Sequence, residues 1–300
     1  METLSLRQAQ RGFEVTPLVT VGIPTYNNPE GLYKTLKCIT RQSYKNLEII
    51  VSDNHSENPE VQAVISKFSM DDMRVQMFRQ SENIGVDANY RFVIDNAHGN
   101  YFMFAQDDDY WTPTYLEACV NWLEANPAAP VASGAARYLT GDERKSDLHF
   151  LQNLSVYKTV GNGDMGLVCM GLWRTEAFRK YEVRLPVYVL GGDHITVAHA
   201  MMGSGKPEIA PLELYSKGYK PGRFQVCFIN DFWYSFRSWW WLMKTLVQSP
   251  HIPKERKLLL PVVAITNLAR ACAVTGVQVV VNMPDNPLKT WTQKRFFGAN

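Results

Sequence analysis

The sequence predicts an α/β fold built on a mostly parallel sheet with helices on both faces. Short apolar runs alternate with segments of helical periodicity as far as about residue 125. Signals that start helices follow these runs, and polar residues close several of them. A repeated β-α-β order needs crossover connections, which cover both faces of a parallel sheet.

Strands are expected where short apolar runs are bounded by polar or turn-forming residues. In chain order these runs are Leu18–Ile23, Leu47–Val51, Arg74–Phe78 and Tyr101–Ala105. Helices are expected between and after them. Following the first run, Asn28, Pro29 and Glu30 supply a cap, a first-turn proline and an early acid. The later helices are predicted from Pro59, over Asp87–Ala97 and from Pro113.

The composition is that of a globular protein with an uneven charge distribution. The 300 residues are 46% hydrophobic and 20% charged, with a net charge of +2. Residues 217–300 carry +9, which leaves residues 1–216 at −7. An acidic body with a basic tail fits a metal-dependent site beside a surface that meets anions.

The cysteines indicate a reducing compartment. They are odd in number and scattered, without zinc-ligand or redox-motif spacing: Cys38, Cys119, Cys169, Cys227 and Cys272. The N-terminal residues Met1–Leu4 lack the basic start and apolar core of a signal peptide. We therefore expect a cytoplasmic protein.

The acidic run Asp107-Asp108-Asp109 directly follows the fourth apolar run. Three adjacent carboxylates repel one another, and a divalent cation such as Mg²⁺ or Mn²⁺ would offset their charge. The alternative is an acidic loop in which one Asp caps the next helix.

Two other strands also end in polar residues. They are Pro24-Thr25-Tyr26-Asn27 and Ser52-Asp53-Asn54. Ligands bind at the carboxyl ends of strands in such sheets, so the three segments predict one binding edge.

The kind of nucleotide site is also constrained, because the chain has neither a G-x-G-x-x-G motif nor a P-loop. Asp53 could accept a hydrogen bond from a base or ribose and Tyr26 could stack on a base; alternatively they are a helix-cap Asp and a half-buried aromatic.

Four segments together resemble glycosyltransferase family 2, which has the GT-A fold. The segments are Val19–Asn27, Ile49–Asn54, Asn83–Gly85 and Gln106–Trp111. The resemblance runs from about Leu18 to about Tyr219. It implies transfer of a sugar from a nucleotide donor, usually with inversion at the anomeric carbon and with a divalent metal.

The resemblance also implies roles for individual residues in the donor and metal site. The base and ribose pocket would be lined by Pro24, Thr25 and Tyr26, and Asp53 would hold the base. Asp87 and Asn89 lie where the family's donor-pocket wall runs. Asp107 and Asp108 would meet the ribose and the metal-bridged diphosphate, and Asp109 would complete the metal site with Asp108, directly or through water.

The resemblance assigns the general base to Asp193, in Gly191-Gly192-Asp193-His194. The family commonly has an acid pair here, but Gly192 replaces its first member. A helix-cap role for Asp193 and a structural or catalytic His194 remain alternatives. Many relatives also carry an Arg-x-His element after a Tyr-rich strand; here Lys217, Lys220 or Arg223 could meet the diphosphate instead, or be solvated surface cations.

We expect a glycosyltransferase domain over residues 1–225 and a helical, aromatic-rich, basic extension over 226–300. Its segments 228–234 and 238–243 hold four of the eight tryptophans, and the extension either docks on a membrane surface or packs on the core or a second subunit. A membrane span over Leu258–Val281 is not expected, because polar residues and a proline interrupt it.

The predicted function is metal-assisted, inverting transfer from a UDP-sugar to a hydroxyl of a glycan or lipid-linked acceptor. The dTDP and GDP sugars remain open as donors, and no nucleic-acid partner is expected. The alternatives are a nucleotidyltransferase, which would want a glycine-rich basic loop after its first strand, and a non-catalytic sugar-nucleotide or glycan-binding protein.

Overall fold

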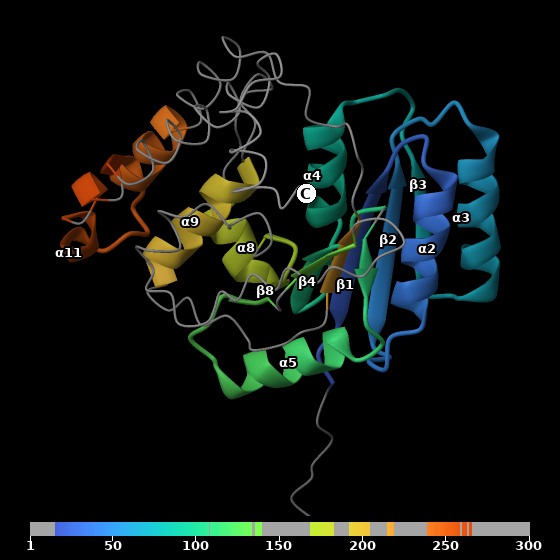
Figure 1. The fold of residues 1–300 in the computed structure, drawn as a ribbon, viewed down its shortest axis with the longest axis horizontal. Helices are drawn as coiled ribbons and strands as arrows, with labels where there is room; N and C mark the ends of the chain where they lie inside the picture. The colour runs from blue at the N-terminus through green and yellow to red at the C-terminus, as the bar shows by residue number, and fades with distance from the viewer. Residues whose placement is uncertain are drawn as a thin grey trace, which may run out of the picture.

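The computed structural model describes residues 16–107, 109–133, 136–139, 169–182, 192–204, 215–218, 239–258, 260–262 and 264–265. Strands and helices alternate along the first part of the chain, as predicted (Figure 1). The elements up to the acidic run are β1 (Val19–Thr25), α2 (Pro29–Thr40), β2 (Leu47–Asp53), α3 (Pro59–Asp71), β3 (Val75–Arg79), α4 (Val86–Asp95) and β4 (Tyr101–Phe104). The elements after it are β5 (Tyr110–Trp111), α5 (Tyr115–Ala125), β6 (Val131–Ala132), β7 (Ala136–Leu139), β8 (Leu172–Arg174), α8 (Thr175–Tyr181), α9 (Gly192–Ser204), β9 (Tyr215–Gly218) and α11 (Lys254–Lys257).

The larger sheet has six strands in the order β3-β2-β1-β4-β8-β6. β1 runs parallel to β2 and β4, and β2 runs parallel to β3. β8 is antiparallel to both β4 and β6. The predicted mostly parallel sheet is confirmed, and the antiparallel β8 is an addition that the apolar pattern did not indicate.

The local start signals explain where the helices begin. The side chain of Asn28 accepts a hydrogen bond from the Gly31 backbone N–H at the start of α2, as expected of a cap. Asn58 caps α3 in the same way through the N–H of Glu60. α5 begins at Tyr115, two residues beyond the Pro113 that the sequence suggested. This small difference arises because Pro113 lies in the loop, where its carbonyl accepts from the Ser43 N–H.

The helices cover both faces of the sheet. Right-handed crossovers place α2 and α3 on one face and α4 on the other. Gly22 of β1 lies under α4, and a Cβ there would come within 2.8 Å of Val93. On this face Phe102 of β4 also contacts Phe178 of α8, with ring centroids 5.8 Å apart. The buried strands β1 and β2 therefore lie between two helical layers, and their polar ends meet at one edge.

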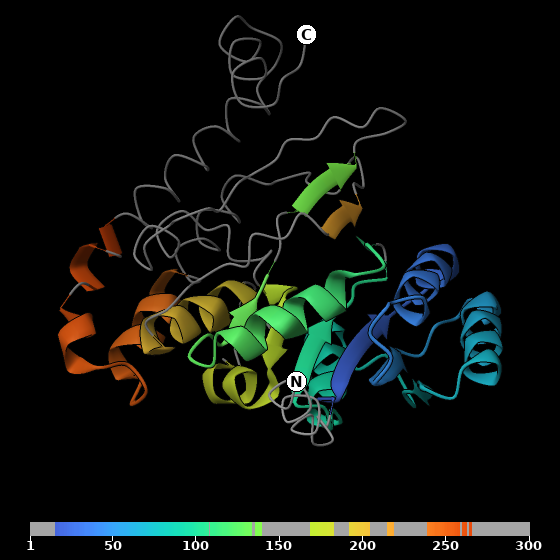
Figure 2. The ribbon, with the colours of Figure 1, turned by 90° about the horizontal axis from the view of Figure 1, so that it is seen from below.

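A second sheet has three strands in the order β5-β9-β7, and its first strand, β5, directly follows the acidic run. β5 is antiparallel to β9, and β7 is parallel to β9. Figure 2 shows β7 and β9 side by side and separate from the larger sheet. The pairing of Tyr110 with Ser216 brings a segment more than one hundred residues away in sequence beside the acidic run.

The C-terminal segment packs on the core through α9. Leu242 and Leu246 are buried within the same apolar cluster as the sheet. His199 of α9 lies 2.6 Å from the Ser249 hydroxyl through its Nε2, and its Nδ1 donates to the Tyr181 carbonyl. Arg256 donates to the Met202 carbonyl at the end of α9. Packing on the core, one of the two alternatives for this extension, is thus observed for residues 239–258.

Two further expectations concern membrane-spanning helices and the cysteines, and the structure describes part of the chain that bears on each. Within it, no helix combines the length and apolar character needed to cross a membrane. Cys38, Cys119 and Cys169 are free thiols. Cys227 and Cys272 lie outside the described residues, as does most of the Leu258–Val281 segment.

Candidate active site

The acidic loop lies at the carboxyl end of β4, beside the carboxyl end of β1. Thr25, the last residue of β1, donates its hydroxyl hydrogen to Oδ2 of Asp107 over 2.7 Å. The side-chain amide of Asn28 donates to the Asp107 carbonyl over 3.0 Å. The two polar strand ends that the sequence predicted to share an edge therefore touch each other.

Helix α2 holds this loop from its first two turns. The Thr35 hydroxyl, which is fully buried, lies 2.9 Å from the Gln106 carbonyl and 3.3 Å from that of Asp109. At Gly31 the approach is so close that a Cβ would lie 1.9 Å from the Asp107 carbonyl oxygen. Any larger residue at position 31 would displace the loop. The backbone of this loop is thus fixed against the helix at the carbonyls of Gln106, Asp107 and Asp109.

The carboxylates of the acidic run differ in exposure. Asp107 is half-buried, whereas Asp109 is only 2% exposed. Tyr90 of α4 lies close to both: burial and then the negative charge of Asp107 raise its pKa well above the usual range. Asp108 lies outside the described residues.

The chemistry of this donor set fits a hard divalent cation. Carboxylate oxygens are the ligands that Mg²⁺ and Mn²⁺ prefer, and Mg²⁺ usually binds through one or two carboxylates together with substrate phosphates. Within the described ranges, which omit Asp108, the structure contains no cluster of three or more His, Cys, Asp or Glu side chains suited to a metal. The carboxylates of the loop fit a divalent cation that substrate phosphates help to bind.

Asp53 lies at the carboxyl end of β2 and is completely buried. Oδ1 accepts from the Ser56 N–H over 3.0 Å. Oδ2 accepts from the Gln62 side chain and, over 3.2 Å, from Arg79. A carboxylate has about four lone-pair sites, so three hydrogen bonds orient Asp53 and leave acceptor capacity for one more donor.

The loop after β1 carries the predicted base-binding residues. Pro24 and Thr25 are buried, whereas Tyr26 is 42% exposed at the mouth of this edge. The next residue, Asn27, has a positive φ of 51°. Its side-chain carbonyl accepts from the backbone N–H groups of Glu57 and Asn58, at 2.9 and 3.1 Å. This short loop is therefore fixed to the loop after β2, with the Tyr26 ring still accessible.

Asp87 and Asn89 lie in the first turn of α4 but face different surroundings. Asp87 is exposed. Asn89 is 3% exposed, and its amide donates to the Ser52 carbonyl over 3.0 Å while its Oδ1 accepts from the Ser52 hydroxyl over 2.6 Å. Asn89 thus ties α4 to the end of β2, and Asp87 is the member of this pair that solvent reaches.

The predicted general base lies at the start of α9. The backbone places Gly192, Asp193 and His194 in the first turn of this helix. Their side chains lie outside what the structure describes. The helix itself is well anchored, since Ile195 is 2% exposed and His199 bonds to both α8 and the C-terminal segment. As expected from the sequence, Asp193 lies at the start of a helix.

Lys217 lies in β9, one residue after the Ser216 that pairs with Tyr110. This register brings the β9 backbone next to the residue that follows Asp109. Lys220 and Arg223, the other two candidate cations, lie outside the described residues.

Four residues of this edge were not singled out as site residues from the sequence: Asn27, Asn28, Thr35 and Arg79. Asn28 was recognised only as a helix cap, and its second hydrogen bond to the acidic loop is a tertiary contact. The adjacent Asn27-Asn28 pair was the available signal, because Asn tolerates positive φ and bonds to nearby backbone. Thr35 gives no such signal within its helix.

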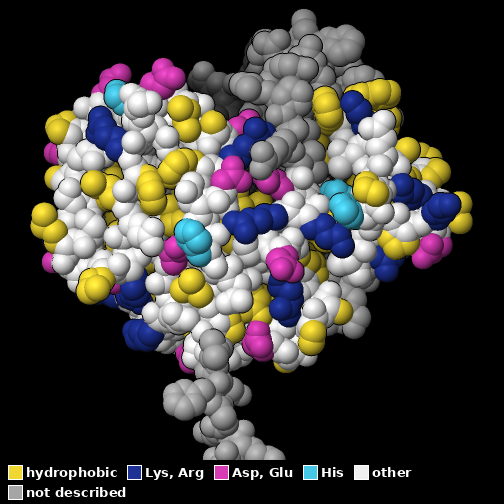
Figure 3. Space-filling model, turned by 180° about the vertical axis from the view of Figure 1, so that it is seen from behind, with side chains coloured by type: hydrophobic (Ala, Val, Ile, Leu, Met, Phe, Trp, Pro, Cys, Tyr) yellow, Lys and Arg dark blue, Asp and Glu magenta, His cyan; other side chains and the backbone are white. Residues whose placement is uncertain are grey.

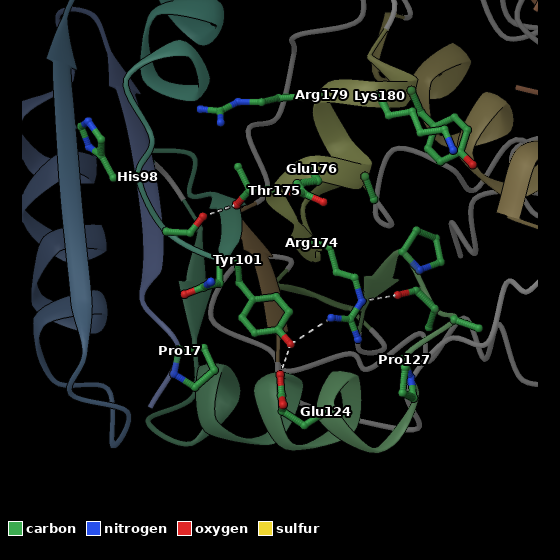
Figure 4. Close-up of a pocket in the computed structure, with 17 residues that line it drawn as sticks. Pro17, His98, Tyr101, Glu124, Pro127, Arg174, Thr175, Glu176, Arg179 and Lys180 are labelled. Atoms are coloured by element: carbon green, nitrogen blue, oxygen red, sulfur yellow. Dashed lines mark hydrogen bonds between the residues drawn. The ribbon is translucent and has the colours of Figure 1, made fainter. Parts of the chain in front are cut away.

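A cavity of about 910 Å³ lies at the opposite, amino edge of the sheet (Figure 4). It is lined by the starts of β1 and β4, the end of α5, and β8 with α8. The Arg174 guanidinium donates to the carbonyls of Ala129 and Leu123 at 3.0 and 2.7 Å, and to the Tyr101 hydroxyl at 3.2 Å. Tyr101 in turn donates to Glu124. The side chains that define this cavity therefore hold chain segments together.

The comparisons with known proteins identify the family of this chain. The family model "Glycosyl transferase family 2" matches residues 20–184, more than half of the chain. The chain belongs to glycosyltransferase family 2. The matched region includes all the segments that carry the sequence resemblance, from β1 to the acidic run.

Curated relatives match over part of their length. A "GalNAc(5)-diNAcBac-PP-undecaprenol beta-1,3-glucosyltransferase" from Campylobacter jejuni is 36% identical over 94 residues, which is 31% of this chain and 30% of that protein. The Escherichia coli "UDP-Glc:alpha-D-GlcNAc-diphosphoundecaprenol beta-1,3-glucosyltransferase WfaP" is 29% identical over 107 residues, 36% of this chain and 41% of that protein. The match to this chain spans less than half of the length of each relative.

Solved structures confirm the GT-A fold. Staphylococcus aureus TarS, residues 1–349, in complex with UDP-GlcNAc has a TM-score of 0.67 at 13% identity, covering 93% of this chain and 80% of that one. The mannosyltransferase PcManGT from Pyrobaculum calidifontis, in complex with GDP-Man and Mn²⁺, has a TM-score of 0.61 at 17% identity, covering 97% of this chain and 89% of that one. At this identity the likeness extends to the fold alone.

Proposed function

We propose that this protein is an inverting glycosyltransferase that moves a sugar from a nucleoside-diphosphate donor, a UDP-sugar first among the candidates, to a hydroxyl of a lipid-linked glycan. The observation that carries the proposal is the fixed acidic loop. Thr25 donates to the Asp107 carboxylate, and Asn28 and Thr35 donate to backbone carbonyls of residues 106, 107 and 109, at the carboxyl edge of a parallel sheet, where ligands of such sheets bind. Family membership supports the transferase class.

The donor nucleotide is assigned to the ends of β1 and β2. In this proposal the exposed Tyr26 ring stacks on the base, and Asp53 accepts a hydrogen bond from it with the acceptor capacity that Ser56, Gln62 and Arg79 leave. Pro24 and Thr25 form the wall of the pocket, with Asp87 and Asn89 on the side of α4. Asp107 meets the ribose.

A divalent metal, Mn²⁺ or Mg²⁺, is assigned to Asp108 and Asp109. When bound, such an ion supplies Lewis-acid stabilisation of the leaving diphosphate. The protein's own part would be to position the loop that carries these residues, and Asn28 and Thr35 donate to the backbone carbonyls of Gln106, Asp107 and Asp109. PcManGT, whose structure contains GDP-Man and Mn²⁺, shares the fold and supports this assignment.

Asp193 is assigned as the general base. In the proposed transfer the acceptor hydroxyl oxygen attacks the anomeric carbon on the face opposite the diphosphate. A new C–O bond forms, the bond to the diphosphate oxygen breaks with its electron pair on the leaving group, and Asp193 takes the hydroxyl proton. Attack from the opposite face inverts the anomeric configuration.

The names of the relatives support a proposal for the acceptor and the location. Two of them are named for acceptors on undecaprenol diphosphate, and this supports a lipid-linked saccharide as the acceptor here. We place the catalytic domain at residues 1–225, the helical extension at 226–300, and the protein in the cytoplasm at the membrane face where such acceptors are exposed.

Donor consumption tests the proposal. UDP-, GDP- and dTDP-sugars are incubated with the full chain and Mn²⁺, and release of free nucleotide is followed with and without EDTA. A transferase hydrolyses one donor class slowly, and EDTA stops it. A protein that binds a donor and leaves it intact would be a binding protein and would contradict the proposal. With a working acceptor, NMR of the product then shows whether the anomeric configuration is inverted.

A further inference from the structure

Residues 239–248 form a helical stretch that is apolar on two sides. On the inner side Leu242 and Leu246 are at most 5% exposed and join the core. On the outer side Trp240 is 57% exposed and Val247 is 54% exposed, with the exposed Lys244 between them. These three residues follow an i, i+4, i+7 spacing, which aligns them on one helix face.

A second stripe with the same spacing follows α11. Leu258 is 78% exposed, Val262 is 53% exposed and Ile265 is 68% exposed. Large apolar side chains this exposed, and gathered in stripes, are unusual on a soluble surface and mark sites of interaction.

The two stripes lie at the same end of the molecule. The indole N–H of Trp239 donates to the Ala264 carbonyl over 3.2 Å, so the residues next to them, Trp240 and Ile265, belong to adjoining chain segments. We call the six residues of the two stripes the apolar end face: Trp240, Lys244, Val247, Leu258, Val262 and Ile265.

Positive charge accompanies this face. Over the described residues between 239 and 265 there are four Lys or Arg and one acidic residue, Glu255. Lys244 and Lys254 are exposed, and Lys244 Nζ lies 4.4 Å from the centroid of the Trp241 ring. In Figure 3 the lobe on the right, which corresponds to the α11 end of Figure 1, shows apolar and basic side chains intermixed. Tryptophan with lysine is the combination that lies in the headgroup region of a bilayer.

We infer that the apolar end face docks on the surface of an anionic bilayer. The apolar side chains enter the boundary between headgroups and acyl chains, and Lys244 and Lys254 meet lipid phosphates. Two copies of this face would bring like charges together, which favours the lipid over a second copy of the chain. The inference deepens the proposed function, because a peripheral enzyme reaches lipid-linked acceptors, but vesicle binding itself needs no turnover.

Vesicle co-sedimentation of the full chain tests this inference. The vesicles are phosphatidylcholine alone or phosphatidylcholine with phosphatidylglycerol. One variant is Trp240→Gln with Leu258→Gln, and another is Lys244→Glu with Lys254→Glu. The matched control is Met70→Gln with Met73→Gln, two methionines that are 85% and 98% exposed in and just after α3. All four positions of the variants are exposed, so melting temperatures should match the wild type and confirm folding.

The wild type and the methionine control should bind the anionic vesicles, and each test variant should bind them at least about tenfold more weakly, because one loses inserted apolar side chains and the other loses attraction to lipid phosphates. Absence of wild-type binding, or equal binding by the variants, overturns the inference. Sedimentation velocity without lipid tests whether a second copy of the chain occupies this face instead. A wild-type dimer that these variants dissociate, together with no vesicle binding, would assign the face to a second copy. A chain that binds vesicles but consumes no donor would contradict the transferase proposal and leave this inference standing.

Discussion

The two edges of the six-stranded sheet use polar side chains in opposite ways. At the amino edge, Arg174 and Arg179 direct their guanidinium groups to backbone carbonyls at the ends of α5 and α4, and a cavity of about 910 Å³ lies between them. At the carboxyl edge, Asp53 accepts three hydrogen bonds and retains acceptor capacity, Asp107 accepts from the Thr25 hydroxyl, and Tyr26 is open to solvent. A choice based on cavity volume alone would place the functional site at the amino edge. The acceptor capacity of Asp53 and the position of the polar residues at the strand ends favour the carboxyl edge, where we propose the site.

The largest effect is expected at the proposed base. Asp193→Asn keeps the size of the side chain but removes the proton acceptor, so transfer to an acceptor should slow by about 10³-fold with donor binding unchanged. Steady-state kinetics and donor titration measure the two quantities. Asp71→Asn, at an exposed position in α3, is the control and should behave as wild type. Retention of full activity in Asp193→Asn would remove this residue from the mechanism.

The next effect is at the amino edge and concerns stability. Arg174→Met leaves the carbonyls of Leu123 and Ala129 without their guanidinium partner, and the free energy of unfolding should fall by about 2–3 kcal/mol. Activity per folded molecule should not change, which urea denaturation and kinetics together can show. Lys180→Met, in the same cavity with its ammonium 5.2 Å from the Tyr181 ring centroid, should cost under about 0.5 kcal/mol. A specific loss of activity in Arg174→Met would mean that the amino edge contributes to the site.

A smaller effect is expected from loosening the acidic loop. Thr35→Val removes the hydroxyl that donates to the loop carbonyls, and the metal-dependent rate should fall by about tenfold because the carboxylates are less well positioned. Thr40→Val is the matched control, since the Thr40 hydroxyl donates to Leu36 within the same helix and does not reach the loop. Equal rates for the two variants would show that α2 does not position the site.

The smallest effect is a pH dependence at the amino edge. Burial alone would raise the pKa of Glu48, but hydrogen bonds from Thr20 and His98 outweigh it and lower the pKa below its usual 4.5. A lowered native pKa stabilises the fold above the unfolded value, and this contribution disappears as pH falls below about 4.5 through the lower native value. Glu48→Gln should therefore flatten the loss of stability with acid, measured as urea midpoints from pH 6 to about 3. The exposed Glu82→Gln should leave the curve unchanged.

The sequence predicted the parts of the fold that have a periodic or capping signal. The apolar runs of β1, β2 and β4 and the Asn-Pro start of α2 were found within a few residues of their observed bounds. The two-residue strand β5 and its partner β9 were not predicted, because so short a strand has no periodicity and its pairing joins distant segments. The antiparallel β8 was missed for the same reason.

The candidate site was predictable as a set of strand ends and less so as a set of contacts. The parallel strands that end at Thr25, at Asp53 and three residues before Asp107 must share an edge, and this follows from the order of elements alone. The direction of each side chain does not follow. Asp87 and Asn89 are two residues apart on one helix, yet only Asn89 turns inward to Ser52. Long-range hydrogen bonds of this kind become visible only when the tertiary structure is known.

The most direct test of the account is calorimetric titration of UDP, dTDP and GDP into the full chain, with Mn²⁺ or with EDTA. Wild type and the control Asp71→Ala should bind one nucleotide in a metal-dependent manner, and Asp108→Ala should lose this binding. Failure of the wild type to bind any of the three nucleotides, or equal binding by Asp108→Ala, would contradict the assignment of the carboxyl edge as the donor site.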